Sequence, residues 1–103
     1  MRATVDRLAV ELDGDHLDGH RLREIETVLR LLMRHLNRAV ADALHRLGSS
    51  GVLEDASGAL RRMREAMTWV EANREASDLW VIQTRLLDAA RSSRDVLAVM
   101  ERL

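Results

Sequence analysis

The chain contains no cysteine and no proline, and Trp69 and Trp80 are its only residues of the Phe, Tyr and Trp class. The absence of cysteine excludes disulfides, thiolate metal sites and cysteine nucleophiles. The absence of proline removes the residue that most strongly interrupts helices, so long helices are expected. With so few aromatic side chains, the core must consist mainly of leucine, valine, alanine and methionine, a mixture typical of helical bundles and coiled coils.

Lysine is also missing, since all 16 basic residues are arginine. Because lysine codons are AT-rich, this composition indicates a high-GC bacterial genome. The formal net charge of −1 argues against a general nucleic-acid binder. No apolar run approaches the roughly 20 residues needed to cross a membrane, and residues 1–12 lack the apolar core of a signal peptide. We therefore expect a cytoplasmic protein, with signal-peptide-independent export as the alternative.

The 103 residues are enough for one domain, and a long apolar stripe dominates it. Its large side chains recur every three or four positions, which is helical spacing, apart from a longer final step: Leu22, Ile25, Leu29, Leu32, Leu36, Val40 and Leu47. The spacing predicts a long helix over residues 17–47, about 45 Å in length. The Gly48–Gly51 segment ends it, and Gly48 suits the left-handed conformation that terminates helices.

A second stripe predicts a helix over residues 53–75, and a third predicts one over residues 78–102. The two stripes differ in phase, and the change falls between Asn73 and Asp78. We therefore predict a break there, with one continuous helix as the alternative. Together these segments indicate an all-α fold, an antiparallel helical bundle with one long and two shorter helices, or a helical hairpin.

Residues 1–16 are predicted to form an N-terminal extended segment and a loop. Leu8, Val10 and Leu12 alternate with other residues, as in a short β-strand, and the Asp13-Gly14 turn signal follows directly. The alternative is a short helix whose apolar face carries Val5, Leu8, Ala9 and Leu12. The following loop lacks the ligand spacing of a calcium site, so no metal or cofactor is expected; a metal shared by His16, His20 and Asp13 is the alternative.

From the sequence, we expect the long stripe to present more apolar surface than one chain of this size can cover. An uncovered apolar face normally marks an interface, so we predict a homo-oligomer, most simply a homodimer, or binding to another helical protein. The expected contact residues are Leu29, Leu32, Leu36, Val40, Trp69 and Trp80. The function that follows is a non-enzymatic protein–protein interaction module that self-associates, such as an assembly subunit, adaptor or small chaperone.

Two alternatives rest on the arginines of the long helix. Arg30 and His35 form an Arg-x4-His pattern that resembles the active-site motif of HEPN-type ribonucleases, which are small helical domains that dimerise and cut RNA. The resemblance implies catalysis by these two side chains. Arg30, Arg34 and Arg38 also form a line at four-residue spacing, an anion-binding pattern that could follow nucleic-acid phosphates. Against this, Glu26 and Asp42 stand at pairing distance along the helix.

Overall fold

The computed structural model describes all 103 residues as four helices: α1 (Arg2–Leu12), α2 (Gly19–Leu47), α3 (Gly51–Asn73) and α4 (Leu79–Met100). The molecule measures 42 × 26 × 18 Å along its principal axes. No helix combines the length and the apolar character that crossing a membrane would require. The fold is therefore all-α, as the stripes predict.

The N-terminal segment is a helix, so the prediction of an extended segment or short β-strand was wrong. Val5, Leu8, Ala9 and Leu12 are buried on one face of α1, which packs against α4. Val10, the residue that the strand alternation would have buried, is instead 74% exposed. The sequence fits both patterns, and the tertiary contact with α4 selects the helical one.

Side chains and glycine fix both ends of α2 and the start of α3. Asp18 caps α2, because its carboxylate accepts a hydrogen bond from the Arg21 backbone N–H at 2.8 Å. Gly48 ends α2 with a φ of 73°, a conformation that favours glycine. The Ser50 hydroxyl then caps α3 by accepting the Leu53 N–H at 3.3 Å. The chain reverses direction within a few residues as a result.

A break separates α3, which ends at Asn73, from α4, which begins at Leu79. It lies where the apolar stripe changes phase, so the continuous-helix alternative was wrong. Buried Glu26 of α2 pairs with Arg74 and Arg30, and the Arg74 Nε donates to it at 3.1 Å. This ion pair attaches the start of the α3–α4 turn to α2.

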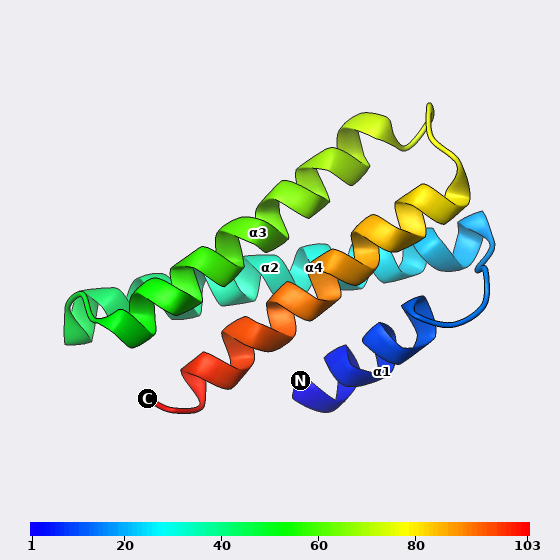
Figure 1. Cartoon of the computed structure of the whole chain (residues 1–103). Coiled ribbons are helices and arrows are strands. Elements are labelled where there is room, and N and C mark those ends of the chain that lie inside the picture. Colours follow the sequence, from blue (N-terminus) through cyan, green and yellow to red (C-terminus); the bar gives the residue numbers. More distant parts are fainter.

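Helix α4 occupies the centre of the bundle, because it contacts α1, α2 and α3. In Figure 1, α3, α4 and α1 lie side by side, and α2 runs behind α3 and α4. The pairing of α3 with α4 is the most extensive in the molecule. One core cluster of 23 buried residues extends over all four helices. The α3–α4 pair therefore has one face that α2 covers and one face that no helix covers.

The single chain covers its own long stripe. Leu29, Leu32, Leu36 and Val40 are all buried within it. Its accessible surface is 6285 Å², whereas a monomeric protein of this mass exposes about 5,900 Å². Because the two areas are close, covering the stripe does not require a second copy. Any self-association must use another surface.

Candidate functional site

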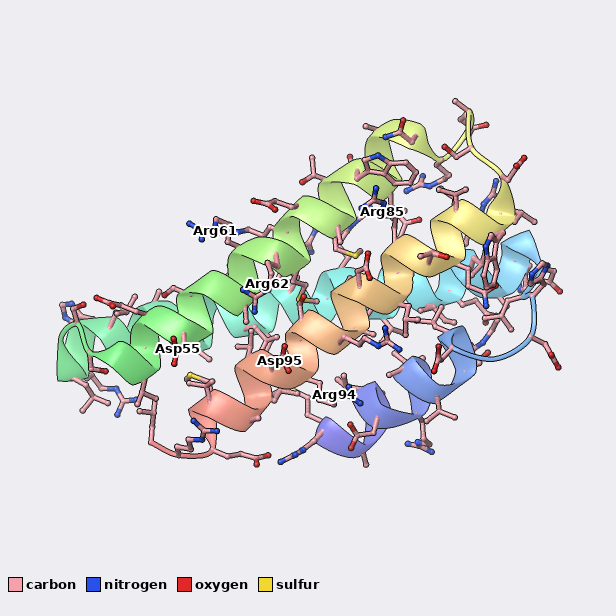
Figure 2. All side chains as sticks on the ribbon, viewed as in Figure 1. Asp55, Arg61, Arg62, Arg85, Arg94 and Asp95 are labelled. Carbon is pink, nitrogen blue, oxygen red and sulfur yellow. The ribbon has the colours of Figure 1, made fainter.

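The uncovered face of the α3–α4 pair contains a groove along the line where the two helices meet, which we call the seam. Two neighbouring hollows of about 450 and 410 Å³ form the groove, and Arg62 and Asp95 line both of them. In Figure 2 these two side chains lie near the middle of the seam, one from each helix. Small residues line the groove as well: Gly58, Ala59, Ala66, Ser92 and Ala98.

Charged side chains of opposite sign stand across the seam from each other. Arg62 on α3 shares both hollows with Asp95 on α4. Asp55, seven residues before Arg62, shares a hollow with Arg102, seven residues after Asp95. Towards the α3–α4 turn, Glu65 shares a hollow with Arg91. Helices α3 and α4 run antiparallel, so these three pairs lie at three successive levels of the groove.

None of the three cross-seam pairs closes into an ion pair within the chain. Arg91 reaches Asp13 instead, at 3.5 Å, and the other five side chains form no ion pair. At the end of the groove near the α3–α4 turn, the Arg85 guanidinium lies 4.8 Å from the ring centre of Trp69. Trp69 is partly buried and packs against the core. The groove thus combines free charges, small residues and one tryptophan.

Trp80, the other tryptophan expected at an interface, lies outside the seam at the start of α4. It is half exposed, as is its neighbour Leu79. The ring of His16 stacks on it with ring centres 4.5 Å apart. The structure therefore separates the two tryptophans, and it places the four aliphatic residues predicted for the same interface inside the core.

The structure does not bring Arg30 and His35 together. Arg30 donates to the buried Glu26 at 2.6 Å and lies 3.9 Å from Glu71 on α3. His35 is exposed and lines a separate hollow of about 310 Å³ with Leu31, Arg34 and Arg38. The same geometry separates Arg30 from the Arg34–Arg38 pair, so the three-arginine line of the sequence is divided between two environments.

Gln83 is a structural residue that the sequence pattern does not reveal. Its side chain is 1% exposed and bonds three groups of the α1–α2 connection. Its Oε1 accepts the Leu17 N–H at 2.8 Å, and its Nε2 donates to the carbonyl oxygens of Leu12 and Asp15 at 3.0 Å each. The only signal in the sequence is a polar residue beside the apolar stripe of α4, which is too common to identify its role.

A second link between α1 and α2 is the ion pair of Glu11 and Arg21. The Arg21 guanidinium donates two hydrogen bonds to the carboxylate, each 2.6 Å long. These hydrogen bonds hold the pKa of Glu11 below its ordinary value and raise the pKa of Arg21. Glu11 belongs to α1, which lies on the opposite side of α4 from α3 (Figure 1).

The arrangement of acids and histidines shows no site for a metal, since no group of three or more such side chains is placed to hold one. Comparison of the chain with models of protein families, with curated proteins and with solved structures finds no match. The functional argument therefore rests on the geometry of the surfaces.

Proposed function

We propose that the protein is a non-enzymatic helical interaction module that self-associates through the uncovered face of α3 and α4. The observation that carries this proposal is the arrangement of opposite charges across the seam at the same level. Within one chain, the Arg62 and Asp95 side chains face a shared groove without forming an ion pair. A second copy can supply partners for both.

A two-fold axis parallel to the seam makes this face complementary to itself. Such an axis places α3 of one copy over α4 of the other and keeps every residue at its own level. Arg62 then meets Asp95 of the second copy, and Asp55 meets Arg102 in the same way. Because the two members of each of the three cross-seam pairs have opposite signs, each of the three cross-copy pairs is attractive. The result is a four-helix arrangement of two α3–α4 pairs.

The composition of the groove also predicts how strong this contact is. Small residues along its floor let a second pair of helices approach closely, and Trp69 provides one large apolar contact, a residue type enriched at interface hot spots. The remaining contacts are between charges near solvent, which are weak and screened by salt. We therefore expect a homodimer that dissociates as ionic strength rises.

Charge reversal at the centre of the seam tests the proposal. The variants Arg62→Asp and Asp95→Arg each place like charges opposite each other in the dimer, so each should be monomeric by sedimentation velocity in about 50 mM salt, a concentration at which charges are weakly screened. Mixing the two variants should produce a heterodimer, because both cross-copy contacts are then attractive again. An effect confined to one chain could not produce this recovery.

The matched control is Arg61→Asp, which changes the neighbouring arginine by the same charge. Arg61 lies outside both seam hollows and, in Figure 2, points away from Asp95. This variant should dimerise like the unaltered chain. The proposal fails if the unaltered protein is monomeric over a wide concentration range at low salt. It also fails if the mixture of the two seam variants stays monomeric.

A further inference from the structure

The outward side of α2, opposite its buried stripe, is a line of exposed residues without a single carboxylate. The line follows steps of three and four residues along the helix: His20, Arg23, Thr27, Leu31, Arg34, Arg38, Ala41 and His45. At 1.5 Å per residue it is about 37 Å long. In a protein whose formal net charge is −1, this side is locally basic.

The acids of α2 lie off this line, and each of them already has a basic partner. Glu24 lies 3.8 Å from both His20 and Arg21. Glu26 is buried between Arg30 and Arg74. Asp42 accepts a hydrogen bond from Arg46 at 3.0 Å, and not from Arg38 as its spacing in the sequence also allowed. No acid of α2 is therefore left for the arginines on the line. Arg23 borders a small hollow together with Glu26 and Glu75, but it forms an ion pair with neither.

Arg23, Arg34 and Arg38 form no ion pair anywhere in the chain. Arg34 and Arg38 stand one helical turn apart, a spacing at which like charges repel each other. Together with Leu31 and His35 they line a hollow of about 310 Å³. An anion in this hollow would remove the repulsion between the two guanidinium groups.

We propose that this side of α2 binds an extended chain of phosphate groups through Arg23, Arg34 and Arg38. The guanidinium group matches phosphate geometry and can donate two hydrogen bonds to one phosphate. The line is long enough to follow several phosphates in succession. Arg30 takes no part, because Glu26 holds it. Figure 1 shows α2 behind the α3–α4 pair, and the line lies opposite the buried stripe by which α2 packs on the bundle. Phosphate binding there therefore leaves the seam free.

The test is binding of a fluorescent 12-nucleotide oligothymidylate, followed by anisotropy at salt concentrations from about 50 to 200 mM, a range over which phosphate contacts lose much of their strength. Three phosphate contacts on a single strand predict a slope of log K against log salt of about −2, and a loss of affinity of about 20-fold over this range. The double variant Arg34→Gln, Arg38→Gln should retain one contact. Its slope should fall to about −0.7, and its affinity at the lowest salt should fall on the order of 50-fold.

The matched control is the double variant Arg61→Gln, Arg64→Gln, which removes the same charge from two exposed arginines of α3 that are also free of ion pairs. It should bind like the unaltered chain. Competition by inorganic polyphosphate separates the two sources of phosphate: a polymer that displaces the oligonucleotide, or one that binds where the oligonucleotide does not, supports a site for the phosphate chain itself. The proposal is overturned if polyphosphate does not displace the bound oligonucleotide. It is also overturned if both double variants lose affinity equally, or if neither probe binds at low salt.

Discussion

The two faces of the α3–α4 pair differ in the size, charge and burial of their side chains. The face that α2 covers is made of large apolar side chains, of which Met63, Met67, Val70 and Leu86 are at most 2% exposed. The uncovered face has small residues along its floor and free charges along its edges. The first face gains stability from apolar burial, at about 25 cal/mol per Å². The second gains almost nothing from its charges within one chain.

This difference separates the residues that determine the fold from those available for function. Removing a covered side chain leaves a cavity in the core, whereas removing a seam charge without a partner in the chain, such as Asp95, is expected to change the stability of the monomer little. Five of the six charges in the cross-seam pairs have no ion-pair partner within the chain. On the proposal of self-association, these charges find their partners in a second copy.

The largest expected effect is on the covered face. Leu86→Ala removes a fully buried side chain of the central helix and should lower the free energy of unfolding by about 2–5 kcal/mol, because the surroundings cannot fill the cavity completely. Asp95→Ala on the uncovered face should change it by less than about 0.5 kcal/mol when both proteins are kept monomeric by high salt. Urea unfolding monitored by circular dichroism measures both, and equal losses would contradict the contrast between the faces.

A polar residue among the buried side chains of α4 gives the next largest effect. Gln83→Leu keeps the side chain at a similar size but leaves the Leu17 N–H and the Leu12 and Asp15 carbonyl groups without their partner. Buried groups without partners are costly, so the free energy of unfolding should fall by about 2–3 kcal/mol. The Leu17 amide should also exchange with solvent faster. Unchanged exchange at Leu17 would show that Gln83 does not hold this connection.

Enlarging a small side chain should also distinguish the two faces. Ala89 on α4 has no exposed surface, whereas Ala98 is partly exposed and lines a seam hollow. Ala89→Leu overfills the packed interior and should cost about 1–3 kcal/mol. Ala98→Leu extends into open space and should leave the unfolding midpoint of the monomer unchanged in high salt, but it should weaken the dimer at low salt by obstructing the seam. Thermal melts and sedimentation of both variants provide the comparison.

The sequence predicted the three longer helices and their buried stripes well, because the spacing of each stripe is local. The stripe from Leu22 to Val40 identified the long helix, and the change of phase after Asn73 located the turn. The seam could not be predicted in this way. Arg62 and Asp95 are far apart in the sequence, and their relation depends on the register of two antiparallel helices. The N-terminal segment fits two periodicities at once, and only its contact with α4 decides between them.

The arginines of α2 show how local spacing can mislead about a site. Four-residue spacing groups Arg30 with Arg34 and Arg38, yet the buried Glu26 takes Arg30 out of the line. Burial of that acid depends on contacts with Arg74 beyond α3, which no pattern within α2 reveals. The positions that do share the outward side, Arg23 among them, become apparent only when the covered side of the helix is known.

The smallest expected effect concerns charges that are paired, in contrast to the free charges of the seam. Arg21 holds the pKa of Glu11 below its ordinary value of 4.5, so the pair stabilises the fold above that value and loses its effect as pH falls through the lowered pKa. Both side chains are about one-third exposed, which limits the effect at pH 7 to less than about 1 kcal/mol. The Glu11→Gln variant should therefore have a lower urea midpoint than the unaltered chain at pH 7, and the difference should shrink as pH falls below about 4. Asp95→Asn, which removes a charge that has no partner in the chain, should have the unaltered midpoint at pH 7 in salt high enough to keep both proteins monomeric. A loss as large as that of Glu11→Gln would mean that the seam charges already stabilise the monomer, and the contrast between the two faces would then be wrong.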